Sequence, residues 1–306
     1  MNDAEKFKSL QTTIKLNPKN FQARRELIML CLDLGFENAA LEHIKYMLTI
    51  FPDDAGLYYN MGICYEMLKD SDSALIAYKK AVEINPDEPD FLYNLALLCE
   101  EKGEIDEAMK YLKKVIYCKE EDENAFFSIG VLYIKKNDPD TAIKCFRKAI
   151  EYNYSDYFAH FYLAGEYKKK KEYDFALSEY KKVLELSEDY SWAYYNIAQI
   201  YWELNRVDDS IVMLKKTIEK NPKDSDAIVL LAQILIKQKR IDEAMMMLTS
   251  AMQLNENGDI YYMAAKVFEL QDDTEQYKNC LQLALDSSET LTFNKKAVDL
   301  ELKKIK

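Results

Sequence analysis

A spacing of 34 residues recurs along this chain. Pro18, Pro52 and Pro86 stand 34 residues apart, and Pro222 follows four such intervals later. The phrase IDEAM at residues 105–109 returns at 241–245, again four intervals on. Small residues share one phase of the same interval: Ala40, Ala74, Ala108, Ala142, Ala176, Ser210 and Ala244. A fixed short period predicts a stack of equal structural units, each of which contacts its neighbours.

Each interval divides into two segments with apolar residues at helical spacing. In residues 55–88 these are Leu57, Met61, Cys64, Tyr65 and Leu68 in the first half, and Ala74, Tyr78, Ala81 and Val82 in the second. A polar turn such as KDSD at 69–72 separates the halves. Asn-Pro pairs at 17–18, 85–86 and 221–222 end second helices, because proline disfavours helix in the residue before it. With only 7 Gly and 6 Pro, the chain has few residues for the turns of sheets. We therefore predict an all-α chain of antiparallel helix pairs.

Small residues also recur in the first helix of each unit, where two helices must approach closely. They are Gly62, Ala96, Gly130, Ala164, Ala198 and Ala232. Together with the Ala40 series, this pattern resembles the tetratricopeptide repeat family, whose motif has Leu-Gly, Tyr, Ala, Phe and Pro at fixed offsets. Residues 55–88 fit it best, through Tyr58, Met61, Gly62, Tyr65, Ala74, Tyr78, Ala81 and Pro86. The resemblance implies a right-handed α-solenoid, a superhelix of stacked helix pairs.

On this resemblance we place about seven full repeats and a degenerate eighth, which has Tyr277 where a small residue is expected. The repeats are 21–54, 55–88, 89–122, 123–156, 157–190, 191–224, 225–257 and the degenerate 258–290. Residues 3–16 are predicted to be an N-terminal capping helix, with Phe7, Leu10 and Ile14 facing inward. Residues 292–306 are predicted to be a lysine-rich C-terminal capping helix, with Val298, Leu302 and Ile305 on one side. Because solenoids need solvated ends, we expect one complete superhelical domain over residues 1–306.

The resemblance implies that the first helices line a concave groove through repeat positions 2, 5, 9, 12 and 13. Position 5 is aromatic in five consecutive repeats: Tyr59, Tyr93, Phe127, Phe161 and Tyr195. These rings are either a wall that stacks against a bound peptide or part of the core. Trp192 and Trp202 fall at positions 2 and 12 of the sixth repeat, which makes that repeat the expected anchor for a partner.

Charged and amide residues follow the same predicted groove. Its acidic part consists of Glu66, Asp90, Glu100 and Glu101, and its basic part of Lys135, Lys168 and Lys169. These blocks either steer a ligand of complementary charge or form an ordinary solvated helix face. Asn60, Asn94 and Asn196 share position 6 and predict an amide ladder that grips a peptide backbone. The alternative for these amides is local capping and hydrogen bonding between repeats.

Composition excludes several function classes. A net charge of −12 argues against nucleic-acid binding and against attraction to anionic membranes. The N-terminus MNDAEKFKSL lacks the apolar segment of a signal peptide, and no apolar run of 18 residues follows, so no membrane insertion is expected. The six cysteines form no CxxC motif. Reduced core thiols in a cytoplasmic protein are the favoured interpretation over disulfides or a metal site.

Catalytic and cofactor-binding signals are lacking. His43 and His160 fall on helical segments, and the chain has no glycine-rich phosphate loop, HExxH or GxSxG motif. The acidic run KEEDEN at 119–124 lacks the glycine and ligand spacing of a calcium loop. We therefore expect no enzyme, no cofactor and no metal.

One known activity of the family also lacks its residues. Relatives that clamp the C-terminal carboxylate of heat-shock chaperones use Lys at position 5 and Asn at position 9, with basic residues two repeats later. This chain has Arg25 and Met29 there, then Asp90 and Asn94. Only the middle Asn60 matches, so no carboxylate-clamp binding of chaperones is expected.

The sequence thus predicts a non-enzymatic scaffold or adaptor that binds a peptide or protein segment in its concave groove. A second hypothesis is a self-assembling structural component, a homo-oligomer that uses the convex face or end helices. A third is a small-ligand sensor or enzyme. Repeat architectures serve secretion, cell division, motility, signalling and chaperoning, so the sequence predicts a mode of action and no particular pathway.

Overall fold

The computed structural model describes residues 2–287 and 289–305, and every regular element in that part of the chain is an α-helix. Residues 1, 288 and 306 lie outside the described residues, although the predicted domain, the eighth repeat and the terminal helix include them. The helices are α1 (Asp3–Leu16), α2 (Phe21–Asp33), α3 (Glu37–Leu48), α4 (Ala55–Met67), α5 (Ser71–Ile84), α6 (Pro89–Glu101), α7 (Ile105–Cys118), α8 (Glu123–Lys135), α9 (Pro139–Tyr152), α10 (Tyr157–Lys169), α11 (Tyr173–Leu186), α12 (Ser191–Glu203), α13 (Val207–Lys220), α14 (Ser225–Lys237), α15 (Ile241–Leu254), α16 (Gly258–Leu270), α17 (Thr274–Asp286) and α18 (Lys295–Lys304). The predicted all-α solenoid fold is confirmed.

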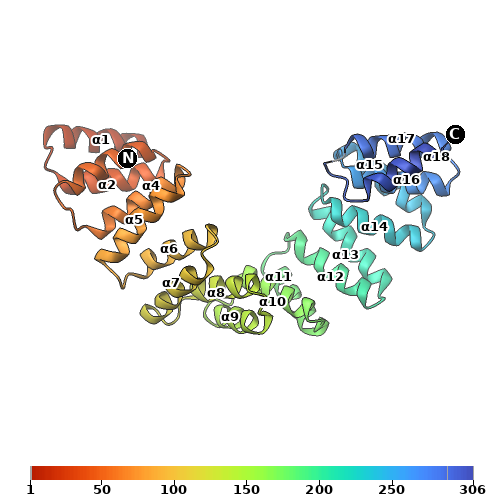
Figure 1. Cartoon of the computed structure of the whole chain (residues 1–306), viewed down its shortest axis with the longest axis horizontal. Coiled ribbons are helices and arrows are strands. Elements are labelled where there is room, and N and C mark those ends of the chain that lie inside the picture. The colour runs from red at the N-terminus through yellow and green to blue at the C-terminus, as the bar shows by residue number, and fades with distance from the viewer. Residues whose placement is uncertain (1, 288, 306) are drawn as a thin grey trace. The chain divides into compact units, whose positions relative to one another are not determined.

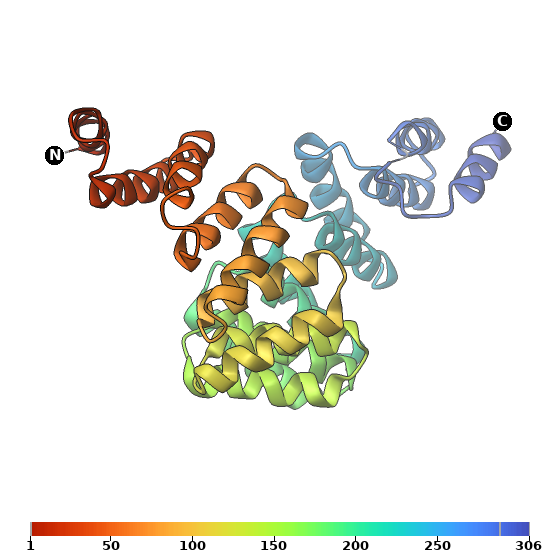
Figure 2. The ribbon, with the colours of Figure 1, turned by 60° about the vertical axis from the view of Figure 1, so that its left-hand side comes forward.

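The helices form two compact units, Met1–Tyr154 and Ser155–Lys306. The first contains α1 to α9 and the second α10 to α18. Within each unit, antiparallel helix pairs follow one another, and each second helix packs against the first helix of the next pair (Figures 1 and 2). A single domain over residues 1–306 stays a prediction.

The two helices of each pair are joined by the same type of turn. After every first helix, one residue adopts a left-handed backbone conformation: Gly35, Lys69, Gly103, Asn137, Lys171, Asn205, Lys239 or Asp272. In the second pair, the Lys69 N–H donates to the Glu66 carbonyl at 2.9 Å and the Asp70 N–H to the Tyr65 carbonyl at 2.8 Å. These bonds satisfy carbonyls that the helix end leaves unpaired. The turn therefore ends one helix and sets the direction of the next.

The core lies between the helices of each pair and between neighbouring pairs. Every member of the Ala40 series is fully buried, including Ser210, whose hydroxyl donates to the Ala198 carbonyl at 2.8 Å. Opposite the two glycines of the first-helix series lie aromatic rings: Gly62 faces Tyr78, and Gly130 faces Phe146. Small residues therefore make room for large ones on the facing helix.

The cysteines lie on these helices as free thiols. Cys31, Cys64, Cys99 and Cys280 are buried, whereas Cys118 and Cys145 are only half-buried. Burial raises the pKa of the Cys64 and Cys99 thiols to about 11, so both stay protonated at neutral pH. In the described part of the chain, no helix combines the length and apolar character that crossing a membrane requires.

The C-terminal helix is shorter than the predicted range 292–306. α18 begins only at Lys295, because the Asn294 side chain accepts from the backbone of Lys296 and Ala297 and caps it. The segment before it is fixed on the eighth repeat through Asp259, whose carboxylate accepts from the Thr292 N–H and hydroxyl, both at 2.6 Å. α18 then packs against α17 with Val298 buried, in the place where a further first helix would lie.

Candidate protein-interaction site

The first helices present repeat positions 2, 5, 9, 12 and 13, a surface that we call the first-helix face. The five aromatic residues at position 5 are all half-buried on it. Tyr59, Phe127 and Phe161 contact second-helix rings, with ring centroids 5.7 Å from Tyr78, 5.6 Å from Phe146 and 5.6 Å from Tyr180 respectively. These rings therefore contribute to the core as well as to the surface.

The hydroxyl groups of this aromatic row join neighbouring repeats. Asn94 donates from Nδ2 to the Tyr59 hydroxyl at 2.8 Å. The hydroxyls of Tyr93 and Ser128 lie 3.2 Å apart in the same way. Such bonds align adjacent first helices, so part of the predicted peptide-binding row serves the stacking of repeats.

The predicted amide ladder has different partners at each step. Asn60 points its Nδ2 at the Met29 sulfur, 3.8 Å away. Asn196 donates to the Trp192 carbonyl at 2.8 Å, and its Oδ1 accepts from the Lys168 ammonium at 2.9 Å. Hydrogen bonding within and between repeats, one of the two interpretations of the sequence, thus accounts for the amide contacts that the structure contains.

The two tryptophans differ in exposure. Trp192 is 48% exposed, and the edge of its ring meets Tyr195 at a centroid distance of 6.3 Å. Trp202 is half-buried, and the Lys237 ammonium lies 4.8 Å from its ring centroid. Trp192 therefore offers the larger free aromatic surface for a partner.

The predicted acidic and basic blocks partly neutralise each other. Glu100 of the third repeat and Lys135 of the fourth form an ion pair at 2.8 Å. Lys169 pairs with the buried Glu166 at 2.6 Å. By contrast, Asp90 and Glu101 are exposed, and Glu66 accepts a hydrogen bond from the Tyr78 hydroxyl. The predicted acidic residues outside these ion pairs, Glu66, Asp90 and Glu101, thus lie on the second and third repeats.

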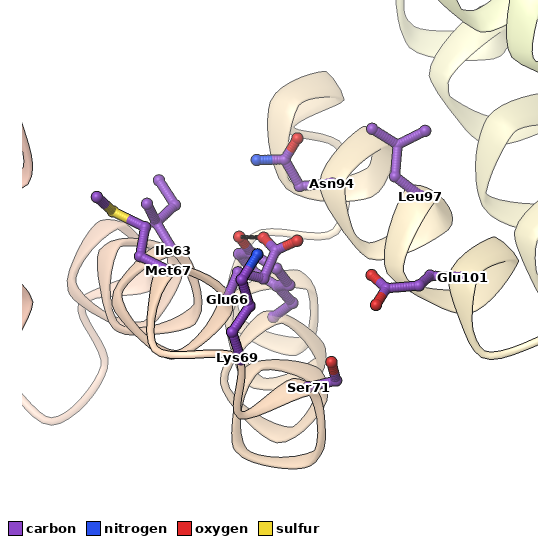
Figure 3. Close-up of a pocket in the computed structure, with 9 residues that line it drawn as sticks. Ile63, Glu66, Met67, Lys69, Ser71, Asn94, Leu97 and Glu101 are labelled. Carbon is purple, nitrogen blue, oxygen red and sulfur yellow. Dashed lines mark hydrogen bonds between the residues drawn. The ribbon is translucent and has the colours of Figure 1, made fainter. Parts of the chain in front are cut away.

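A pocket of about 580 Å³ opens between these two repeats (Figure 3). We call it the acidic pocket. Its lining residues are Ile63, Glu66, Met67, Lys69, Ser71, Tyr78, Asn94, Leu97 and Glu101. In Figure 3, Glu66 and Glu101 project from different helices, and Ile63, Met67 and Leu97 supply apolar walls. Three predicted site residues, Glu66, Asn94 and Glu101, are thereby brought together.

A second pocket, of about 330 Å³, lies between the fifth and sixth repeats. We call it the basic pocket, lined by Gly165, Lys168, Lys169, Lys171, Tyr180, Asn196 and Glu203. Every one of these positions lies three 34-residue intervals after a position that lines the acidic pocket. Tyr180 and Asn196 repeat Tyr78 and Asn94, whereas Lys168 replaces Glu66. The two units therefore contain one pocket design with opposite charge.

The sequence interpretation missed the tyrosines of both pockets. Tyr78 and Tyr180 are both almost fully buried; Tyr78 fits the sequence pattern only as an apolar residue of a second helix, and the sequence interpretation does not single out Tyr180. The available signal is a second-helix Tyr sixteen residues before a first-helix Asn, a pairing that occurs at Tyr78 with Asn94 and at Tyr180 with Asn196. Asn60 follows Ile44 at this spacing instead, and it lines neither pocket.

The histidines have ordinary structural surroundings. His160 is buried, and its Nδ1 lies 2.6 Å from the Glu179 carboxylate on α11. His43 lies 2.8 Å from the Arg24 guanidinium, and burial together with that cation lowers its pKa. Within residues 2–287 and 289–305, no three His, Cys, Asp or Glu side chains gather as a metal site would require.

Solved structures with similar folds are numerous. The crystal structure of MamA is 25% identical, with 54% of this chain and 97% of that chain covered and a TM-score of 0.51. YrrB, described as a TPR protein with an unusual peptide-binding site, is 23% identical over 64% of this chain and 97% of its own, with a TM-score of 0.53. A tetratricopeptide repeat protein from Parabacteroides merdae is 18% identical over 81% and 97%, with a TM-score of 0.58.

No curated protein sequence matches the chain significantly. Four family models described as tetratricopeptide repeat do match, at residues 55–88, 77–110, 123–156, and 167–234 with 208–267. Together these matches cover more than half of the chain. The chain therefore belongs to the tetratricopeptide repeat family, whose members are generally non-catalytic scaffolds for protein–protein interaction.

Proposed function

We propose that this chain is an adaptor that binds a segment of a partner protein along its first-helix face. The observation that carries the proposal is the pocket that recurs at equivalent positions of the two units. Each pocket opens between first helices of adjacent repeats within its own unit, so a side chain of a bound segment can enter between the helices while its backbone follows the face of that unit.

Exposed apolar groups on the same face support the proposal. Met67, Leu97 and Trp192 are 41%, 37% and 48% exposed and occupy positions 13, 9 and 2 of their repeats. Aromatic and methionine side chains contribute large contact areas at protein interfaces. The half-buried aromatic row lies beside them and gives the face rigidity through its bonds between repeats.

The test compares two triple variants in capture from the native host's lysate. The face variant carries Met67→Ser, Leu97→Ser and Trp192→Ser, which remove exposed surface and leave the core intact. The control carries Ile76→Ser, Tyr117→Ser and Val212→Ser, on second helices, where these residues are 72%, 87% and 49% exposed. Circular dichroism checks that both remain helical.

A protein held by the wild type and by the control, and lost by the face variant, supports the adaptor. Placing a photo-crosslinking amino acid at position 97 then identifies the contacting segment of that protein. If all three proteins capture the same partners equally, the first-helix face is not the binding surface.

Self-assembly is a second candidate, favoured by one outward-facing cleft. It encloses about 550 Å³ and is lined by Tyr58, Met61, Tyr65, Ser73, Ile76, Ala77, Lys79, Lys80 and Glu83. The Ile76 side chain is 72% exposed there, so contact with a second copy would remove apolar surface from water. Light scattering over a hundredfold concentration range separates the candidates: a mass that rises with concentration, and that Ile76→Ser holds at the monomer value, supports self-assembly.

A further inference from the structure

The acidic pocket combines two carboxylates with apolar walls. Glu66 comes from α4 and Glu101 from α6, and Lys69 on the turn after α4 is the one cation among its lining residues. Ile63, Met67 and Leu97 line its sides (Figure 3). A ligand group that suits this pocket has a flexible apolar stem and a positively charged end.

One carboxylate is held in place before any ligand arrives. The Tyr78 hydroxyl donates to Oε2 of Glu66. Tyr78 is fully buried, and its ring lies against Gly62, so its hydroxyl cannot turn away without repacking the core. Burial and the neighbouring Glu66 raise the pKa of Tyr78, which keeps the hydroxyl protonated as a donor. The other oxygen of Glu66 remains for a ligand cation.

The basic pocket shows where a cation lies in this design. There the Lys168 ammonium is held by the Asn196 Oδ1 at 2.9 Å and by the Gln199 side-chain oxygen. In the acidic pocket the equivalent amide, Asn94, donates from Nδ2 to Tyr59, which leaves its Oδ1 as an acceptor. Lys168 thus places its ammonium in the basic pocket of the second unit, whereas carboxylates line the equivalent pocket of the first unit.

We propose that the acidic pocket binds an arginine or lysine side chain of the partner segment, between Glu66 and Glu101 and beside the Asn94 oxygen. The aliphatic stem packs on Met67 and Leu97. This inference rests on the adaptor function proposed above and adds the chemistry of the partner at one site.

The basic pocket does not accept the same group. Lys168 and Lys169 stand at the positions of Glu66 and Met67, and Lys171 at the position of Lys69, so three lysines line this pocket beside the one acid, Glu203. Like charge then repels an incoming cation, although the Tyr and Asn frame is the same. It is therefore a matched internal control.

The experiment uses the full chain with methionine methyl groups labelled by ¹³C, because Met67 lines the acidic pocket. The probes are N-acetyl-arginine amide, its neutral analogue N-acetyl-citrulline amide, and N-acetyl-glutamate amide. Arginine amide is expected to shift the Met67 signal in a saturable way, with citrulline amide at least about tenfold weaker. The signal of Met47, which is fully buried, reports whether the fold is intact.

Variants then test the residues. Glu66→Gln with Glu101→Gln is expected to weaken arginine amide binding by at least about tenfold while the Met47 signal stays unchanged. Lys69→Gln removes the competing cation and is expected to tighten binding. Lys168→Gln, in the basic pocket, is expected to leave the Met67 titration as in the wild type.

Three results overturn the inference: no response of Met67 to arginine amide, an equal response to citrulline amide, or an unchanged titration in the Gln double variant. A response to calcium chloride with none to arginine amide also overturns it, in favour of a metal site. Failure here is distinct from failure of the adaptor proposal, because partner capture by the first-helix face does not depend on which side chain enters this pocket.

Discussion

A Cβ atom built on Gly130 would lie 2.6 Å from Cε1 of Phe146, closer than carbon atoms approach in folded proteins. Gly62 and Tyr78 have the same relationship at 2.4 Å, two repeats earlier in the chain. Where the first helix has alanine instead, as at Ala96, Ala198 and Ala232, the residue sixteen positions later is leucine. In the fifth repeat, Ala164 precedes Tyr180 at this spacing, and a glycine follows at 165. Small and large residues are thus matched within most pairs.

This matching predicts that Gly130→Ala destabilises the protein. Alanine favours helix over glycine by about 1 kcal/mol, but overpacking against Phe146 costs about 1–3 kcal/mol and is expected to outweigh it. Adding Phe146→Leu recreates the Ala96–Leu112 combination and is expected to restore most of the loss. Urea denaturation measures both. A Gly130→Ala variant as stable as the wild type contradicts the prediction.

The turn residues with a left-handed backbone conformation predict opposite changes in stability at equivalent positions of two repeats. Lys239 has φ 58° and Gly103 has φ 78°, at the same position of their repeats. Side chains with a Cβ disfavour this conformation by about 1 kcal/mol, so Lys239→Gly is expected to stabilise by about that amount. Gly103→Ala is expected to destabilise similarly through the backbone alone, because no atom lies within 4 Å of the added Cβ. Thermal unfolding of the two variants should shift in opposite directions.

The attachment of the C-terminal segment depends on Asp259. Asp259→Ala leaves the Thr292 and Phe293 N–H groups without their acceptor and is expected to cost about 1–3 kcal/mol locally. Amide hydrogen exchange in α18 should then become faster, while α10 to α13 keep their protection. Asp226, the exposed residue at the same position of the seventh repeat, is the control, and Asp226→Ala should leave α18 unchanged. Equal exchange in all three proteins would show that α18 is held by other contacts.

Lys168 predicts a dependence of stability on pH. Burial lowers its pKa in the folded protein. Ionised Lys168 therefore opposes folding below that pKa, and the penalty disappears as pH rises toward the ordinary lysine pKa of about 10.4. Relative to Lys168→Met, the wild type should gain stability across this range. Lys102 is the opposite case, because its bond to Asp72 raises its pKa. Its stabilising effect relative to Lys102→Met is therefore full below the ordinary lysine pKa of about 10.4 and is lost only as pH rises above it. Thermal midpoints from pH 7 to about 10.4 check the sign for Lys168, and midpoints above that pH check the sign for Lys102.

Much of the fold could be predicted from the sequence because the 34-residue spacing and the prolines place helix ends at the same positions. Asn17, Asn85 and Asn221, each before a proline, end α1, α5 and α13 as cap residues. The C-terminal helix was predicted too long, because its apolar spacing continues into a segment whose backbone is held by Asp259.

The site was harder to predict because side-chain partners lie 28 to 35 residues away in sequence. Glu100 and Lys135 belong to opposite predicted charge blocks, yet they form one ion pair across a repeat boundary. Tyr59 is an aromatic residue of the type expected to contact a ligand. Its ring instead packs on Tyr78, and its hydroxyl accepts a hydrogen bond from Asn94. Only the packing of neighbouring repeats decides which polar atoms remain for a partner.

In both pockets, shape and charge are encoded by separate residues. Tyr78 with Asn94, and Tyr180 with Asn196, shape the two cavities, whereas the difference in charge between them comes from one short stretch of the first helix, Glu66 and Met67 against Lys168 and Lys169. Exchanging Glu66 and Met67 for the Lys168 and Lys169 pair is therefore expected to reverse the charge of the acidic pocket while its tyrosine and asparagine stay in place. On the adaptor function proposed above, the chemistry that a partner meets changes one repeat at a time through these two positions.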